Sequence, residues 1–275
     1  MGNKAADYIK EKAIDVKNSM GNIDVGKGLV QAAKLPIAKI NRAEFLEKEL
    51  KLLYPEDIVQ LAIDKSPAYA GIPKTAINEL AKKSINYETL KVSTISFAAG
   101  IPGGVAMLGT IPADLTQYFI FSLRVMQKLA YLFSFQEFDL NDDQINDETM
   151  NSMLIFLGVM FGVQEANTGL KILAKAATAR AVKQIERVGL MKIPAYVALK
   201  KIALNLGLKM NRQILQKAVS GVIPILGGVL MGGVSYGSFK ISANRLRKQF
   251  LELPISDPDF YKDPASIDTY IQADE

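Results

Sequence analysis

Apolar residues recur along most of this chain at the three- and four-residue spacing of an α-helix. Residues 3–20 show the pattern first, with Ile9, Ala13 and Val16 on one side. We predict further helices from the cap at residue 41 to about 53, from 55 onward, at 74–98, 112–135, 150–188 with a break near 165–169, 194–219, and up to about 251. No segment alternates apolar and polar residues convincingly, as a half-buried strand does. The pattern therefore predicts an all-α fold.

Start and stop signals support these boundaries. Asn41, followed three residues later by Glu44, is a capping-box start for a helix. Pro55 can open the next helix at its first position. Ser66–Pro73 contains two prolines and a glycine, which predicts a loop, and the acidic run Gln136–Glu148 predicts another, solvated loop.

The chain shows no long low-complexity linker, which favours a single compact multi-helix domain with glycine-rich apolar hairpins. We expect residues 1–40 to form an N-terminal helical extension and 41–252 the helical domain. Residues 253–275 carry three prolines and several acids, so we expect an acidic, loosely ordered tail.

Composition narrows the chemistry. The 275 residues are 49% hydrophobic, with a mean hydropathy of +0.13, but include neither cysteine nor histidine. Disulfides, zinc–thiolate sites, thiol nucleophiles and Ser-His-Asp triads are therefore excluded, and we expect no metal and no cofactor. Charges begin at Lys4 with no apolar core after them, unlike a signal peptide, so we expect a cytoplasmic protein.

Two uncharged runs, Val92–Ala113 and Ala218–Phe239, are each about as long as a bilayer span. Both are rich in glycine, which suits close helix packing in a core and also shallow or full membrane insertion, and the pattern leaves these readings open. The glycines expected at close helix crossings are Gly103, Gly104, Gly109, Gly228, Gly232, Gly233 and Gly237.

Two carboxylates and one arginine stand out in apolar surroundings. Asp114 lies in the first turn of a predicted helix, where an acid complements the helix dipole. Arg124 follows ten residues later, roughly 15 Å along the axis, too far to pair with it. We therefore predict a structural ion pair between Arg124 and a partly buried Glu165, and keep Asp114 and Glu165 as weak catalytic candidates.

Charge is concentrated in one region. Residues 171–217 contain eleven lysines and arginines against Glu186 alone, whereas the whole chain carries a net charge of +5. A helical face of a single sign indicates an anionic partner. The residues predicted to bind an anionic surface are Lys171, Lys175, Arg180, Lys183 and Arg187.

Several segments carry a family resemblance. GIPGGVAMLGTIPADLTQYFIFSLRVMQKLAYL at 100–132 resembles the signature region of the EcsC family of bacterial proteins, and KAVSGVIPILGGVLMGG at 217–233 resembles its second block. Residues 44–63 and 157–166 also fit, so the similarity spans about 42–250. The resemblance implies an all-helical fold, a bacterial source and an association with an ABC exporter system, but no reaction and no catalytic residue.

These observations favour a non-enzymatic, peripheral membrane accessory protein that assists a transporter or export system. Its expected partners are an anionic membrane surface and a membrane transporter, and self-association into a homo-oligomer stays open. Nucleic acid is disfavoured because no aromatic stacking platform lies among the lysines. The alternatives are a soluble helical protein that binds a hydrophobic ligand, and a carboxylate-based hydrolase acting on lipid or peptide.

Overall fold

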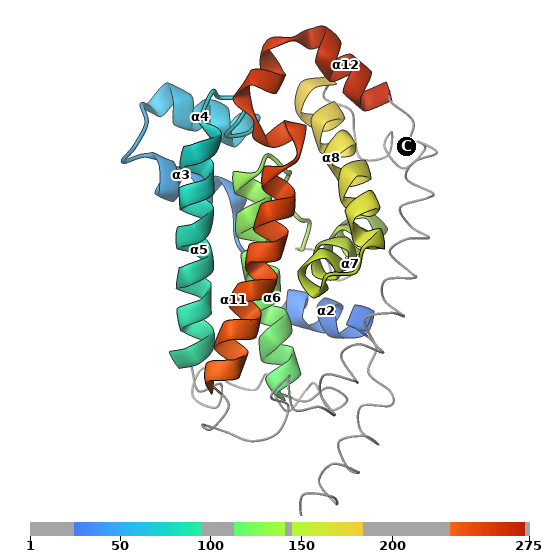
Figure 1. Ribbon diagram of the computed structural model, residues 1–275. Coiled ribbons are helices and arrows are strands. Elements are labelled where there is room, and N and C mark those ends of the chain that lie inside the picture. The colour runs from blue at the N-terminus through green and yellow to red at the C-terminus, as the bar shows by residue number, and fades with distance from the viewer. Residues whose placement is uncertain (1–24, 95–112, 141–144, 184–231, 273–275) are drawn as a thin grey trace, which may run out of the picture.

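The computed structural model describes residues 25–94, 113–140, 145–183 and 232–272. Every regular element in these ranges is an α-helix or a short 3-10 helix, and none of the described residues forms a strand (Figure 1). The predicted all-α fold is confirmed for this part of the chain.

Three long helices run side by side through the molecule: α5 (Lys74–Thr94), α6 (Ala113–Leu132) and α11 (Gly232–Leu251) (Figure 1). Helix α7 (Asp147–Phe161) packs against α11 and α6, and α8 (Glu165–Lys183) packs against α7. The remaining elements surround this group, and they are α2 (Val25–Lys34), η1 (Pro36–Ala38), α3 (Arg42–Leu50), α4 (Glu56–Asp64), η3 (Pro254–Ser256), η4 (Pro258–Lys262) and α12 (Pro264–Gln272).

The core is centred on aromatic rings near the end of α6. Phe250 of α11 lies 4.9 Å, between ring centroids, from both Phe135 and Phe156. Phe133 joins them at 5.8 Å from Phe250. These edge-to-face and tilted contacts join α6, α7 and α11, and each such pair adds about 0.5–1.5 kcal/mol beyond the burial of its area.

The predicted helix signals are confirmed where the structure describes them. The Asn41 side chain accepts a hydrogen bond of 2.9 Å from the Glu44 backbone N–H and caps α3. The break expected near 165–169 lies earlier, at Gly162, which adopts a left-handed φ of +77° at the end of α7, and α8 already begins at Glu165. The predicted helices at 3–20 and 194–219 lie outside the described residues.

The two ends of the chain correct the predicted domain division. Within α2, Leu29, Ala32 and Ala33 are fully buried in the core, so residues 25–40 are no extension. The predicted loosely ordered tail is wrong as far as Gln272, because Ile255 and Ile267 are also buried and three short helices form. Apolar side chains between the prolines anchor this tail, and the prolines begin its helices.

The described glycines and helices can be compared with the two roles expected for the uncharged runs, close helix packing and membrane insertion. Among the described residues, nothing lies within 4 Å of the position a Cβ would take at Gly237, so no described neighbour packs closely there. Gly232 and Gly233 begin α11, while the predicted packing glycines at 103, 104, 109 and 228 lie outside the described residues. Among the helices that the structure describes, none is both long and apolar enough to cross a membrane.

Alanine substitutions at two glycines should have opposite effects on stability. Gly162 has a positive φ, which is strained for any residue with a Cβ, and an added Cβ would lie 3.2 Å from the Arg245 guanidinium. Gly162→Ala should therefore lower the free energy of unfolding by about 1–2 kcal/mol. Gly237→Ala adds a methyl group in open space inside a helix and should raise it by up to about 1 kcal/mol. Urea unfolding of both variants tests the pair, and equal effects would contradict it.

Candidate functional site

A fully buried carboxylate binds two cations at the centre of the bundle. Glu88 of α5 has no exposed side-chain surface. Arg124 of α6 donates from Nε to its Oε2 at 2.9 Å and from Nη2 to its Oε1 at 3.1 Å. Lys128, one helical turn further on, places Nζ 2.6 Å from the same Oε1. The three side chains connect α5 to α6, and we refer to them as the Glu88 cluster.

The environment of Glu88 contains opposing effects on its ionisation. Burial alone would raise the pKa of this carboxyl, but the hydrogen bond from Arg124 and the positive charges of Lys128 and Arg124 together lower it below its usual value. Glu88 is therefore ionised at neutral pH, and the cluster carries two positive charges and one negative charge.

Side chains on the same face of α6 also form hydrogen bonds with the backbone of the segment after α2. Arg124 donates from Nη1 to the Ile37 carbonyl at 2.6 Å. Gln127 donates from Nε2 to the Ala38 carbonyl at 2.7 Å and accepts from the Ile40 N–H at 3.0 Å. The polar residues of α6 therefore satisfy the backbone groups of η1 and hold it on the bundle.

The predicted partner of Arg124 is wrong, although a buried ion pair with a carboxylate from another helix is present. Glu165 lies exposed in the first turn of α8, and Glu88 takes its place. A signal for Glu88 exists in the sequence: it continues the stripe of Ile77, Ala81 and Ile85, which are buried on α5. A glutamate on that stripe faces the core.

The two weak catalytic candidates are not brought together by any described contact. Asp114 lies in the first turn of α6, as predicted, but its side chain lies outside the described part. In the parts of the chain with described side chains, no three acidic residues gather as a metal site would require. The described geometry thus gives no support to carboxylate-based hydrolysis.

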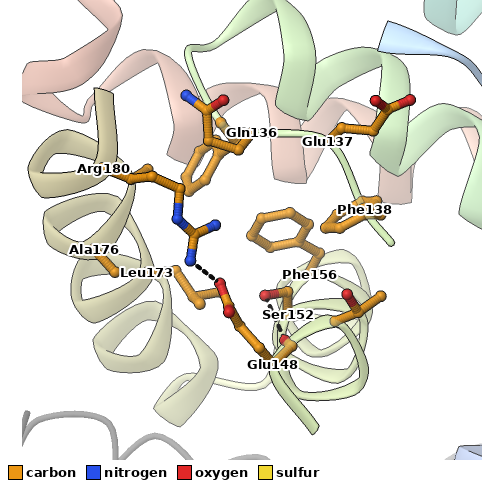
Figure 2. A pocket seen from close by; sticks show the side chains of 12 residues that line it. Gln136, Glu137, Phe138, Glu148, Ser152, Phe156, Leu173, Ala176 and Arg180 are labelled. Carbon is orange, nitrogen blue, oxygen red and sulfur yellow. Dashed lines mark hydrogen bonds and ion pairs between the residues drawn. The ribbon is translucent and has the colours of Figure 1, made fainter. Parts of the chain in front are cut away.

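Arg180 was predicted to bind an anionic surface, and this prediction is wrong. Its Nη2 donates to Glu148 Oε1 on α7, and its side chain points into a cavity rather than outward (Figure 2). Lys171 is exposed as expected, and Lys175 is half-buried with Nζ 6.0 Å from the centre of the Tyr270 ring on α12. The side chains of Lys183 and Arg187 lie outside the described residues. An arginine on a lysine-rich helix looked like a surface residue because its acidic partner is distant in sequence.

The cavity beside this ion pair is small. Its volume is about 40 Å³, enough for two or three water molecules. Glu148 Oε2 and Arg180 Nε are buried there without a hydrogen-bond partner among the described residues. Pockets for drug-sized ligands are roughly ten times larger, so this cavity does not support the predicted alternative of a hydrophobic ligand. The residues that line it come from α7, α8 and the segment after α6 (Figure 2).

One end of the bundle gathers exposed apolar side chains. Helix α5 ends, and α6 and α11 begin, at this same end (Figure 1). Near it, Tyr87 and Leu90 of α5 are 47% and 55% exposed. Lys91 places Nζ 4.7 Å from the centre of the Tyr87 ring. We call Tyr87, Leu90 and Lys91 the bundle-end surface.

Comparisons with known proteins do not assign this site. No protein-family model matches the chain, and no match was found among curated proteins or among solved structures.

Glu88→Gln should strongly destabilise the fold. The amide keeps the shape of the side chain but leaves Arg124 and Lys128 buried without a counter-charge, which costs about 3–5 kcal/mol. Glu79→Gln, on the same helix but exposed and paired only with Lys82, is the matched control and should cost less than about 1 kcal/mol. Urea unfolding measures both, and similar values would contradict the central role of the cluster.

The pH dependence of the same variants gives a second measure of this prediction. Because the folded state lowers the pKa of Glu88, its contribution is complete above the unfolded pKa of about 4.3 and is lost as the pH falls through the lower, folded value. Wild-type stability should therefore decline on acidification in this range. Glu88→Gln should lack that component of the decline, whereas Glu79→Gln should retain it.

Substitution of Arg180 should lower the stability of the fold more than substitution of Lys171. Arg180→Gln leaves the largely buried Glu148 without its cation and should cost about 1–3 kcal/mol of stability. Lys171→Gln, at an exposed position on the same helix, should change stability by less than about 0.5 kcal/mol. Thermal unfolding followed by circular dichroism compares them, and a stable Arg180→Gln variant would show that the inward ion pair is dispensable.

Proposed function

We propose that this chain is a non-enzymatic, membrane-associated accessory protein that docks on an anionic bilayer through the bundle-end surface. The observation that supports this most is the convergence of three helix ends beside exposed Tyr87 and Leu90 (Figure 1). Those helix ends border the uncharged runs Val92–Ala113 and Ala218–Phe239, so both runs adjoin the same end of the bundle.

Lysines and exposed apolar side chains at this end of the bundle would both favour binding to an anionic bilayer. Lys91 directly precedes the first uncharged run and Lys240 directly follows the second. A lysine beside an anionic bilayer contributes about 1 kcal/mol, and burial of an exposed leucine about 1.5–3 kcal/mol. The attraction of the lysines is screened over a Debye length of about 8 Å at physiological salt. Reversible, salt-sensitive adsorption follows from contributions of this size.

The resemblance of residues 42–250 to the EcsC family supports the same proposal. That resemblance implies a bacterial source and an association with an export system, so the proposed partner at the membrane is a transporter. The proposed location is the cytoplasmic face of the membrane.

Vesicle sedimentation should show binding to liposomes that contain anionic lipid and little binding to neutral ones, with release at high salt. The double variant Leu90→Asp, Lys91→Glu should bind at least tenfold more weakly, because it removes an apolar contact and reverses a charge. Lys51→Glu, Leu52→Asp is the matched control, since it makes the same changes at exposed positions in the turn between α3 and α4. This control should bind as the wild type does.

Three outcomes would contradict the proposal. They are equal affinity for neutral and anionic vesicles, no affinity for either, and equal loss of binding in the two double variants. Circular dichroism spectra of both variants should match the wild type, because all four substituted side chains lie at least partly in solvent.

A further inference from the structure

A buried arginine locks α3 and α4 into a rigid hairpin. Arg42, the first residue of α3, is 5% exposed. Its guanidinium donates to the carbonyls of Ala62 and Lys65 at 3.2 Å each, and also to the Ile63 carbonyl. These acceptors form the carboxyl end of α4, where the helix dipole is negative and a cation is stabilised.

Neighbouring chain segments reinforce this lock. Arg42 Nε donates to the Phe135 carbonyl at 3.4 Å, and the Arg42 N–H donates to Glu137 Oε1 at 3.0 Å. Burial lowers the pKa of Arg42, but an arginine stays protonated at neutral pH. Of the five hydrogen bonds that Arg42 donates, three therefore hold α3 to α4 and two hold the base of the hairpin to the segment after α6.

The tip of the hairpin presents two leucines to solvent. Leu52 is 88% exposed and Leu53 is 59% exposed, more than most large apolar residues in the described ranges. Backbone hydrogen bonds from Leu53 and Tyr54 to the Leu50 carbonyl, at 2.8 Å and 3.0 Å, hold the turn. Because the backbone is already ordered, binding through these leucines would cost little conformational entropy.

The charge around the leucines is negative. Residues 42–65 carry six carboxylates against three lysines and Arg42, although the chain as a whole carries +5. Glu56 lies three residues after Leu53, and both Glu56 and Asp57 are exposed in the first turn of α4. Carboxylates beside an apolar pair repel an anionic bilayer and attract a basic surface.

We propose that the α3–α4 hairpin is a docking site for a protein segment with an apolar stripe flanked by lysines or arginines. Leu52 and Leu53 insert between apolar side chains of that segment, and Glu56 and Asp57 face its cations. The hairpin lies toward the end of α5 at which that helix begins, away from the bundle-end surface (Figure 1). The inference therefore goes beyond membrane docking and does not depend on it.

The test uses a synthetic 18-residue helical peptide with leucines at positions i, i+3, i+4 and i+7 and lysines on the flanks of that stripe. Its affinity for the full-length chain is measured by fluorescence anisotropy. We expect Leu52→Ser, Leu53→Ser to weaken binding about tenfold or more, because two apolar contacts are lost. Leu90→Ser, at an exposed leucine of the bundle-end surface, is the matched control and should leave the affinity unchanged.

A second pair of substitutions tests how much the carboxylates of the hairpin contribute to peptide binding. Glu56→Gln, Asp57→Asn should weaken binding severalfold and reduce its salt dependence. A peptide with glutamates in place of the lysines, or with the same residues scrambled so that no leucine stripe forms, should bind at least tenfold more weakly than the designed peptide.

Three results would overturn the inference. Equal affinity for the designed and scrambled peptides, or for wild type and the Leu52→Ser, Leu53→Ser variant, would show that the hairpin is not the binding site. Loss of vesicle binding in this variant would make the leucines a membrane anchor. A dimer of the wild type, detected by analytical ultracentrifugation and abolished by the same substitutions, would make the occupant a second copy of the chain.

Discussion

The packing of the bundle depends on the burial of the Glu88 carboxylate between two cations of the neighbouring helix. A lone carboxylate there would cost several kcal/mol, and so would Arg124 or Lys128 without it. Because Arg124 engages both carboxylate oxygens, a shift of α5 against α6 by one turn would break the pair and leave charges buried. The cluster therefore fixes the register of the two helices more than it adds net stability, since a well-packed apolar replacement can be as stable as a buried ion pair.

Arg42 and Arg124, whose side chains are largely buried, are stabilised by different partners. Arg124 combines a carboxylate with the Ile37 carbonyl, whereas the Arg42 guanidinium relies on backbone carbonyls at the end of α4. In both cases the fork of N–H donors joins elements that are distant in sequence. Arg124 fastens η1 to the bundle, and Arg42 fastens α3 to α4. The arginines thus place the outer helices, while aromatic packing between Phe135, Phe156 and Phe250 forms the centre.

Local sequence signals predicted the helices well, because caps and turns depend on near neighbours. Asn41 with Glu44 and the proline- and glycine-containing loop at 66–73 act within a few residues. The partners of Arg124 and Arg180 were missed because each lies more than thirty residues away in the chain. The tail was misjudged for a similar reason: Ile255 and Ile267 are buried only because the core offers them a surface. Composition suggested disorder, and tertiary contacts decided otherwise.

The Glu88 cluster also contacts a partly exposed aromatic ring, that of Tyr87. Lys128, whose Nζ binds Glu88, lies 4.7 Å from the centre of the Tyr87 ring, and Lys91 lies at the same distance from it. A ring held by two cations keeps its orientation, which lowers the entropy lost when it meets an apolar surface. The buried charge that sets the register of α5 and α6 therefore also orients the most prominent aromatic side chain of the bundle-end surface. A membrane-docking face and a structural core that share Tyr87 cannot be altered independently. The α3–α4 hairpin touches the same cluster, because Lys128 Nζ lies 5.7 Å from the centre of the Phe45 ring on α3.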